Sequence, residues 1–508
     1  MDCCGWICRQ KTDTSQAEVN FTDLPQELKE RIFRHLTATD LCRLALCNRI
    51  LRALTNQDAM WRPLCRKKGW ERYGTICDLS KEPPFKPTSS QHQKPGEGGA
   101  PTFPADAVVT RSDWPGLVDT CKWKEVYTKA RHLEENLRNQ RYYAMSLELC
   151  PPDVLPCALC DVLLVNIAGE GDCLVAGLNI GLLQIWDLSS GKRQHLILVN
   201  VSSSPDALKM KNDIIAAGCR DGKIRTYSAQ TGEQLQVMSG HRLAVSHLFF
   251  DGDTIVSVAR PQVKRLEYAD SDIRVWSAAN GASRCILQSG HEATRLLHLD
   301  YKDKIVAGAY SDNTIRIWDV RNGSLIMQHV VCDTINLTSC HLWDGIVVGA
   351  SKDHTVKISE LNSGECTKTF NVDVLPNPDT EVRYMLSDGL LVVVKLDVHH
   401  GFNIVNLNGE RLLTDAGRHV NPLWFRGNTL LTHGIVTHDD AQGYELWIID
   451  PEDRMDGNAS GSSMTKAPQY LGGTSVVCAW MSDTKVAFQR KQSQFYTPTD
   501  DVCVHHYW

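Results

Sequence analysis

Four stretches of the chain repeat one pattern, in which apolar and polar residues alternate, an aromatic and a small polar residue follow, and a turn ends the stretch. They are LLQIWDLSSGK (182–192), KIRTYSAQTGE (223–233), DIRVWSAANGA (272–282) and TIRIWDVRNGS (314–324). Their aromatic residues, Trp186, Tyr227, Trp276 and Trp318, are 41, 49 and 42 residues apart. Alternation with a period of two predicts β-strands, and a repeat of about forty residues indicates propeller blades.

Weaker copies continue the repeat toward the C-terminus. They are TVKISELNSGE (355–365), GFNIVNLNGE (401–410) and YELWIIDPED (444–453). Second apolar segments accompany the repeats at 174–178, 214–218, 255–259, 305–309, 346–350, 391–395, 430–434 and 485–490. Eight such segments predict eight four-stranded blades. Seven blades are the alternative, because the last two repeats are degenerate.

A closed ring of blades needs a strand that joins its two ends. The segment YYAMSLEL (142–149) precedes the first repeat, and a last apolar segment lies at 501–508. We expect these two segments to pair, because their pairing protects the sheet edges that an open ring would expose.

The turns between the second and third strands of several blades contain an aspartate: Asp221, Asp312 and Asp353. A carboxylate at such a place accepts hydrogen bonds from the amides of a tight turn. The turns resemble those of WD repeats, in which the aspartate pairs with the histidine of a Gly-His dipeptide. Two such dipeptides occur, at His241 and His291, and we interpret both histidines as structural.

A different period governs residues 21–70. Apolar residues recur there at steps of three and four, at Leu24, Leu28, Ile32, Phe33 and Leu36 and again at Leu41, Leu44, Ala45, Cys47 and Leu51. Cap residues at 22–23 and 37–40 would open the helical segments. The pattern predicts a bundle of short amphipathic helices. A segment of this size is too short to bury a hydrophobic core comfortably by itself. We therefore expect it to expose an apolar face that binds a partner.

These helices resemble an F-box. The resemblance rests on the Leu24-Pro25-x-Glu27-Leu28 opening, on the stripe from Ile32 to Leu36, on Asp40-Leu41 and on Trp61. An F-box before WD repeats resembles the F-box/WD-repeat family, and residues 123–143 resemble the helix that this family places between the two. The chain departs from many F-boxes at 46–49, where it reads Leu-Cys-Asn-Arg.

The resemblance implies an all-β WD-repeat propeller of eight blades, or seven, preceded by a small all-α F-box domain and a linker helix. The expected boundaries are a disordered Cys-rich N-terminus at 1–19, the F-box at 20–70, a flexible Pro/Gly-rich insertion at 71–113, the linker helix at 114–143 and the propeller at 144–508.

The resemblance also implies a function without catalytic residues in this chain. F-box/WD-repeat proteins are substrate receptors of SCF (Skp–cullin–F-box) ubiquitin ligases, in which the F-box docks on a Skp-type adaptor and, through it, on a cullin and a RING protein. The implied adaptor anchors are Leu24, Pro25, Leu28, Ile32, Phe33, Leu41 and Leu44. Alternatively, these residues pack against one another, and the chain is a scaffold whose degenerate F-box binds another partner.

The propeller would bind the protein substrate through loops on one face. Candidate substrate-binding residues near the turn aspartates and Gly-His dipeptides are Arg220, Arg242, Lys264, Arg265, Arg295, Tyr310 and Lys352. Arginine pairs with phosphate in a bidentate manner, so a phosphorylated or acidic peptide would suit them. Alternatively, they are ordinary solvated surface charges.

Composition narrows the classes of function that the sequence leaves open. A net charge of −6 gives no reason to expect nucleic acid, and no apolar run approaches the roughly 18 residues of a membrane span. The first residues lack the apolar centre of a signal peptide, so we expect a cytoplasmic location, with the nucleus as an open alternative. The 19 cysteines are scattered, and Cys157 and Cys160 have no second metal-binding pair, so we expect no metal.

No motif for an enzyme or a cofactor occurs in a suitable context, and we expect neither catalysis nor a cofactor. Cys3 and Cys4 could accept palmitate, although a Cys-rich terminus without lipid is the simpler interpretation.

Overall fold

A computed structural model gives the fold. It describes residues 24–75, 79, 120–139, 141–149, 163–200, 203–259, 272–287, 294–330, 337–372, 382–387, 389–395, 402–415, 420–427, 429–435, 442–449, 469–472, 478–490 and 501–508. The chain divides into two compact units, one of residues 1–76 and 111–131 and one of residues 77–110 and 132–508. The predictions for 1–19, Cys3, Cys4, most of 71–113, Cys157, Cys160, Lys264, Arg265 and His291 lie outside the described residues.

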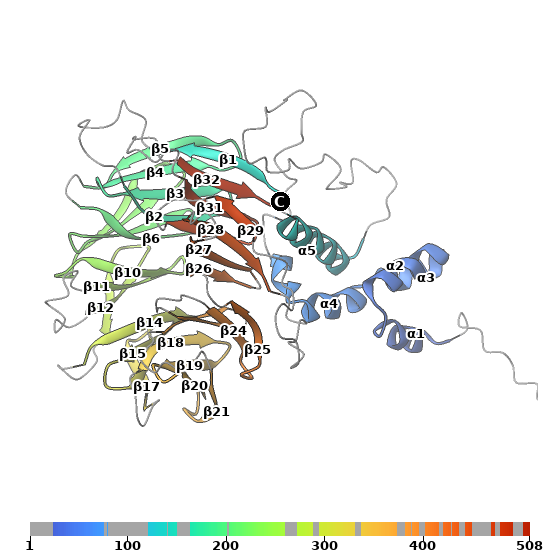
Figure 1. Ribbon diagram of the computed structural model, residues 1–508. Coiled ribbons are helices and arrows are strands. Elements are labelled where there is room, and N and C mark those ends of the chain that lie inside the picture. Colours follow the sequence, from blue (N-terminus) through green and yellow to red (C-terminus); the bar gives the residue numbers. More distant parts are fainter. Residues whose placement is uncertain are drawn as a thin grey trace, which may run out of the picture. The chain divides into compact units, whose positions relative to one another are not determined.

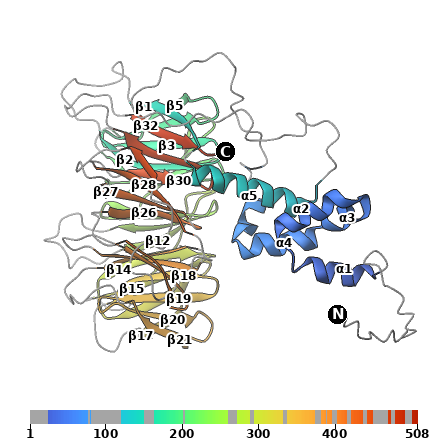
Figure 2. The same ribbon diagram turned by 45° about the vertical axis from the view of Figure 1, so that its right-hand side comes forward.

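The first unit is helical. Its elements are α1 (Gln26–Phe33), α2 (Ala38–Cys47), α3 (Arg49–Thr55), α4 (Asp58–Lys67), the 3-10 helix η2 (Trp70–Thr75) and the first part of α5 (Lys122–Arg138). Figure 2 shows α2 and α3 beside each other. Thr37 caps α2 as expected, because its hydroxyl accepts the amide of Asp40 at 3.2 Å. The linker helix expected within 114–143 is α5.

Five apolar side chains form the buried core of this unit: Phe33, Leu41, Leu54, Met60 and Trp61. The indole Nε1 of Trp61 donates to the carbonyl of Thr55 at 2.7 Å, so its polar end is satisfied inside the core. Tyr127 of α5 packs edge-on against the Trp61 ring, with centroids 5.2 Å apart. The start of α5 therefore completes the core that α1 to α4 build.

The second unit consists of antiparallel four-stranded sheets. The first sheet contains β2 (Leu164–Glu170), β3 (Cys173–Leu178), β4 (Leu182–Asp187) and β5 (Lys192–Leu198), and the second contains β6 (Pro205–Lys211), β7 (Ile214–Cys219), β8 (Ile224–Ser228) and β9 (Gln234–Met238). The third contains β10 (Val245–Phe250), β11 (Thr254–Ala259), β12 (Asp272–Ser277) and β13 (Ser283–Leu287), and the fourth contains β14 (Leu296–Lys302), β15 (Ile305–Tyr310), β16 (Thr314–Asp319) and β17 (Ser324–Val330). We number these sheets as blades one to four.

Blades five to seven follow the same order. They are β18 (Leu337–Trp343), β19 (Ile346–Ser351), β20 (Thr355–Glu360) and β21 (Cys366–Asn371); β22 (Val382–Ser387), β23 (Leu390–Lys395), β24 (Phe402–Asn406) and β25 (Arg411–Asp415); and β26 (Val420–Arg426), β27 (Thr429–Ile435), β28 (Gln442–Ile448) and β29 (Gln469–Gly472). Blade eight contains β30 (Ala479–Met481), β31 (Lys485–Arg490), β32 (Asp501–His506) and β1 (Tyr143–Glu148).

The prediction of eight blades is confirmed, and the seven-blade alternative is wrong. Each predicted second apolar segment lies in the second strand of a blade, and the aromatic marks share one register. Trp318 lies opposite Val306, and Ser359 and Val405 occupy the equivalent places opposite Val347 and Leu391. The first strands of most neighbouring blades pack against one another and so line the inside of the ring.

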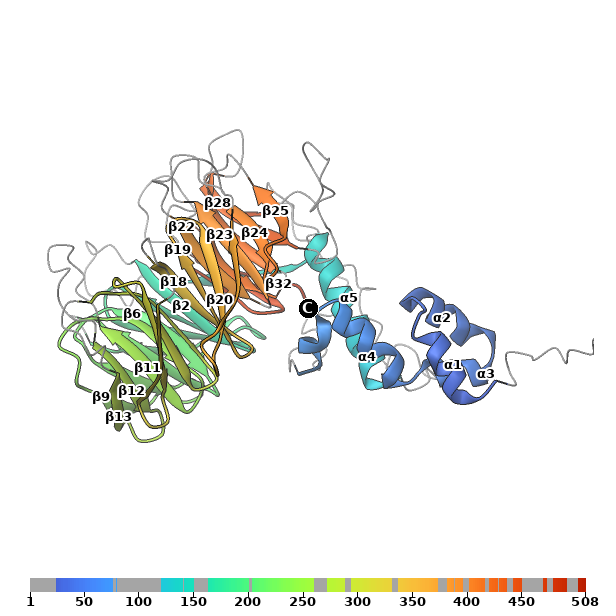
Figure 3. The same ribbon diagram turned by 90° about the horizontal axis from the view of Figure 1, so that it is seen from below.

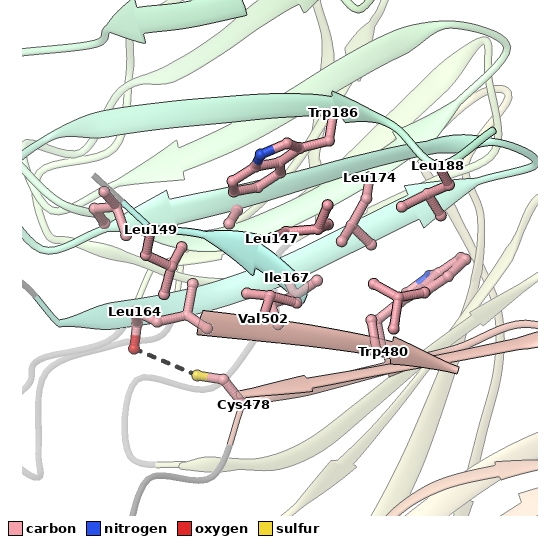
Figure 4. Close-up of a cluster of buried hydrophobic side chains, with 14 of the residues drawn as sticks. Leu147, Leu149, Leu164, Ile167, Leu174, Trp186, Leu188, Cys478, Trp480 and Val502 are labelled. Carbon is pink, nitrogen blue, oxygen red and sulfur yellow. Dashed lines mark hydrogen bonds between the residues drawn. The ribbon is translucent and has the colours of Figure 1, made fainter. Parts of the chain in front are cut away.

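The predicted closure of the ring is also confirmed. Strand β1 pairs antiparallel with β32 over six residue pairs, from Tyr143 opposite His506 to Glu148 opposite Asp501 (Figure 1). Blades one and eight share a core beside this closure, in which Leu147 of β1 lies with Trp186 and Trp480 (Figure 4). The Cys478 thiol donates to the carbonyl of Leu164 at 3.4 Å across the same junction.

A recurring glycine lets the outer strands of neighbouring blades fit together. Gly232 ends the turn before β9 with a φ of +75°, and a Cβ at this position would lie 3.0 Å from the His195 ring of blade one. Gly323 before β17 has a φ of +72°, and its Cβ would lie 2.8 Å from that of Cys285. Only glycine combines this backbone conformation with so close an approach.

Ion pairs join neighbouring blades at the edge of the ring that carries the turns between first and second strands. Asp251 of blade three accepts hydrogen bonds from the Lys304 ammonium at 2.8 Å and from the Tyr301 hydroxyl at 2.5 Å, both in blade four. Burial alone would raise the pKa of Asp251, but the hydrogen bonds from Lys304, Tyr301 and two turn amides outweigh it and lower the pKa to about 2. Asp251 therefore stabilises the contact between two blades in its ionised form.

We predict that Asp251→Asn destabilises the propeller at neutral pH. The folded pKa lies below the ordinary value of 3.8, so the stabilisation is complete above that value and is lost as the pH falls toward 2. The shift would correspond to roughly 2 kcal/mol, which solvent screening reduces to about 1 kcal/mol. Urea unfolding should show this difference at neutral pH and a narrowing gap between about pH 5 and pH 3. Asp303→Asn, at an exposed position in the next blade, is the control, and equal gaps for both variants would contradict the account.

Candidate functional site

The first candidate surface lies on α1. Leu28 and Ile32 are one helical turn apart and keep 44% and 43% of their surface exposed. On the polar side of the helix, the Gln26 amide donates to the carboxylate of Glu30 at 3.0 Å. An eight-residue helix that buries Phe33 in the core cannot bury this second pair as well. The result is an apolar stripe in contact with solvent.

The seven predicted adaptor anchors divide into three groups. Pro25, Leu28 and Ile32 are exposed, and Leu24 and Leu44 are half-buried. Phe33 and Leu41 are buried in the core of the helical unit, each 1% exposed. These last two side chains pack within the unit, because they form the contact between α1 and the helices that follow.

Two exposed apolar side chains escaped the sequence reasoning. Leu46 lies in the last turn of α2 and Ile50 in the first turn of α3, and they are 78% and 65% exposed. Asn48 separates the two helices, since its extended backbone ends α2 while its side chain caps α3 through the Leu51 amide at 2.8 Å. The signal was the departure from the F-box pattern at 46–49, because this cap breaks the helix and leaves Leu46 and Ile50 outside the buried face.

The second candidate surface is one edge of the propeller. Pro205 at the start of β6 lies opposite Cys219 at the end of β7. The turn that follows each second strand and the loop that precedes each first strand therefore meet at the same edge of the ring. The predicted substrate-binding residues that are described all belong to these turns and loops or lie beside them.

The turn of blade two is built around Asp221. Its carboxylate accepts the Lys223 amide at 3.1 Å, as the sequence predicted, and both guanidinium nitrogens of Arg225 at 3.1 and 2.7 Å. Burial acts to raise the pKa of Asp221, but the Arg225 and Lys223 hydrogen bonds prevail and lower it. The pairing in turn raises the pKa of Arg225. A buried arginine thus does the work that the resemblance to WD repeats assigned to a histidine.

Blade four repeats this arrangement. Asp312 accepts the Thr314 amide at 3.1 Å and the guanidinium of the fully buried Arg316 at 2.6 Å. In blade five, Asp353 accepts the amide of Thr355 at 3.0 Å. The arginine belongs to the third strand, four residues after the aspartate, so the spacing Asp-x-x-x-Arg carries the pairing.

His241 is buried and hydrogen-bonded, in keeping with the structural role that the sequence predicted. Its Nε2 lies 2.7 Å from the hydroxyl of Ser257, which also accepts the Trp276 indole at 2.8 Å. In blade seven, the Trp447 indole donates in the same way to Thr432 at 3.0 Å. Trp447 occupies the aromatic register mark of that blade, which the degenerate repeat had hidden.

Two pairs of the predicted substrate-binding segments are brought together. Gly222, beside Arg220, packs against the loop of Arg242, because a Cβ there would lie 2.7 Å from the carbonyl of His241. The Arg295 carbonyl accepts the amide of Ser311, and its own amide donates to the Ser311 hydroxyl, both at 2.9 Å. Arg220, Arg242 and Arg295 are exposed.

The other two predicted substrate-binding residues that the structure describes are less exposed than these arginines. Lys352 is half-buried. Tyr310 is not at the mouth as expected: it is 2% exposed, because its ring packs edge-on against Trp318 and under the Arg316 guanidinium at 4.3 Å. Burial raises its pKa. Arg220 is also engaged, since its Nε donates to Asp206 at 3.3 Å while its side chain stays 58% exposed.

Within the part of the chain that the structure describes, no group of three or more His, Cys, Asp or Glu side chains could hold a metal ion. Among the same residues, no helix is long and apolar enough to cross a membrane.

Family comparisons identify both units. A model described as F-box-like matches residues 21–67, and a model described as WD domain, G-beta repeat matches residues 283–319. The chain therefore joins an F-box-like domain to a WD-repeat propeller, the combination that defines F-box/WD-repeat proteins, and the resemblance inferred from the sequence is confirmed. Both are modules that mediate interactions between proteins. No curated protein matches the chain.

Solved structures with partial similarity include two computationally designed proteins and one bacterial protein. Ika8 is 21% identical, with a TM-score of 0.39 over 57% of this chain and 97% of its own. Ika4 is 29% identical, with a TM-score of 0.25 over 30% and 89%. BamB from Moraxella catarrhalis is 16% identical, with a TM-score of 0.40 over 53% and 81%.

We predict that the Asp221–Arg225 pair holds the turn of blade two. Asp221→Ala leaves a buried guanidinium without its counter-charge and should lower the free energy of unfolding by about 2 kcal/mol. Adding Arg225→Met should restore most of the loss, because no charge then stays buried. The exposed pair Arg321–Asp319 serves as the control, with an expected coupling below about 1 kcal/mol. Additive effects of the two substitutions in blade two would contradict this role.

Proposed function

We propose that this protein is a substrate receptor of an SCF-type ubiquitin ligase. In this role the F-box-like helices dock on a Skp-type adaptor, which links them to a cullin and a RING protein. The propeller binds the protein to be ubiquitinated, which then becomes a target for degradation. The chain itself supplies binding surfaces and no catalytic group.

The observation that carries the proposal is the apolar stripe of Leu28 and Ile32 on α1. The F-box-like match covers this helix, and an F-box engages its adaptor through apolar contacts. Pro25, with the half-buried Leu24 and Leu44, extends the anchor set at its margins. Phe33 and Leu41 support the stripe from inside the unit.

The substrate surface that we propose is the edge of the propeller that bears Arg220, Arg242, Arg295 and Lys352. Three of these cations are exposed, and the aspartates of their turns are already paired with arginines in blades two and four. Arg220 keeps its side chain 58% exposed although it pairs with Asp206, and these cations favour an acidic or phosphorylated segment.

The ubiquitination rate would rise through proximity. A substrate held on the propeller meets the ubiquitin-charged enzyme at an effective concentration far above its free concentration, because both are bound to one complex. Removing the adaptor contact would therefore abolish ubiquitination of the substrate without changing its affinity for the propeller.

We predict that Leu28→Ser/Ile32→Ser lowers adaptor binding at least tenfold, because two half-exposed apolar side chains would lose their burial at the interface. The readout is co-purification of the adaptor and cullin with the full-length chain, with binding to purified adaptor measured by calorimetry. Leu325→Ser/Ile326→Ser, at equally exposed apolar positions on β17, is the matched control.

Retention of both partners by the α1 variant would contradict the docking surface. If the unchanged chain binds no adaptor at all, the receptor proposal fails, and a scaffold whose helices bind another partner becomes the better account.

A further inference from the structure

The outer strand of blade two, β9, is one of three outer strands that contain no Asp, Glu, Lys or Arg, together with β17 and β29. Strand β9 reads QLQVM and contains no charged residue, whereas β5, β13 and β21 carry Lys192 and Arg193, Arg284 and Lys368. It is the last strand of its sheet, so one of its backbone edges has no strand partner. Figure 3 shows β9 and β13 at the outer side of their blades. An edge without charges is a template for the addition of another strand.

Two apolar side chains on β9 are turned to solvent. Leu235 and Val237 are 43% and 44% exposed, and Leu235 lies at a bulge, because Tyr227 pairs with Gln234 and Thr226 with Gln236. Arg225 of the neighbouring strand β8 pairs with Val237, and its charge is neutralised by Asp221. The surface offered by β9 is therefore apolar in its centre.

The two ends of β9 have opposite charge. Lys223 immediately precedes β8, whose first residue Ile224 pairs with Met238 at the C-terminal end of β9. Arg242 lies in the loop that follows β9, and both cations are exposed. The exposed Glu233 immediately precedes the first residue of β9. A strand that ran antiparallel to β9 would meet the cations with its N-terminal end and the glutamate with its C-terminal end.

We propose that β9 binds an extended peptide segment as a fifth, antiparallel strand of blade two. The segment has acidic residues at its N-terminal end, alternating apolar residues in the middle and a basic residue after them. Backbone hydrogen bonds to the free edge provide part of the affinity, Leu235 and Val237 select the alternating apolar side chains, and the charged ends fix the direction. The inference rests on the proposed function only in taking the segment as part of a substrate or a regulator.

A linear segment fits this surface better than a second copy of the chain. The five residues of β9 span roughly 17 Å, and one strand of that length buries far less than the roughly 800 Å² per partner of a standard stable interface. Strand addition to an edge tolerates so small a contact, because its affinity comes from backbone pairing over a short length.

Strand β17 provides an internal control. It is also an outer strand without Asp, Glu, Lys or Arg, and it also exposes two apolar side chains, Leu325 and Ile326. The turn beside its C-terminal end, Ser311 to Asn313, contains no lysine or arginine, whereas the equivalent turn of blade two contains Arg220 and Lys223 beside its aspartate. A peptide chosen by β9 should therefore not bind to β17.

The test uses the full-length chain and a fluorescent peptide of two glutamates, alternating valine and threonine over five positions and a lysine. We expect Leu235→Lys to weaken binding at least tenfold, and Lys223→Glu/Arg242→Glu to do the same. Leu325→Lys and Arg321→Glu, in blade four, should leave the affinity unchanged. Val237→Thr keeps the β-branched shape and should weaken binding several-fold even if the lysine variant unfolds.

The reversed peptide should bind at least tenfold more weakly, and added salt should weaken the forward peptide. The proposal is overturned by a forward peptide that does not bind, by equal binding of both directions or by equal losses in the control variants. A concentration-dependent dimer that Leu235→Lys dissociates would also overturn it, because β9 would then bind a second copy. Adaptor binding is measured separately. A chain that binds the peptide but not the adaptor rejects the ligase-receptor proposal, and a chain that binds the adaptor but not the peptide rejects the β9 site.

Discussion

The pairing of β1 with β32 is the constraint on which the propeller depends. The two strands are more than 350 residues apart in the chain, as the hydrogen bond between Ser146 and Asp501 illustrates, yet their six-residue register completes blade eight. Without β1, that blade would have three strands, and the shared core around Leu147 and Trp480 would open to water. Closure also removes the exposed edges between the first and last blades, so the free edges that remain are those of the outer strands.

A closed ring makes the turns of neighbouring blades a single surface, and the arginine–aspartate pairs determine its charge. Asp221 and Asp312 are neutralised by buried Arg225 and Arg316, while Arg220, which pairs with Asp206, keeps its side chain 58% exposed. At the opposite edge, Asp251 and Lys304 balance each other across two blades. The first edge is the one that we propose for an anionic partner, whereas the other is held together by ion pairs between blades. In the helical unit, the same division separates the buried Phe33 from the exposed Leu28 and Ile32.

The fold was predictable from the sequence because its signals are periodic. Alternating apolar residues located all eight second strands, and the position of 142–149 before the first repeat predicted the closing strand. The sites were less predictable, because burial depends on contacts between segments that are distant in the chain. The position of Tyr310 at the end of a strand suggested a surface residue, but Trp318 and Arg316 bury it. The exposure of Leu46 and Ile50 follows from the cap at Asn48, which interrupts the helical period.

The central claim is that α1 is the adaptor-binding element of a substrate receptor. Hydrogen–deuterium exchange of the full-length chain, with and without a saturating Skp-type adaptor, tests it most directly. The account predicts slower exchange in the helical unit, strongest over Gln26–Phe33, and unchanged exchange in β2 to β32. Unchanged exchange over Gln26–Phe33, or protection confined to the propeller strands, would contradict it.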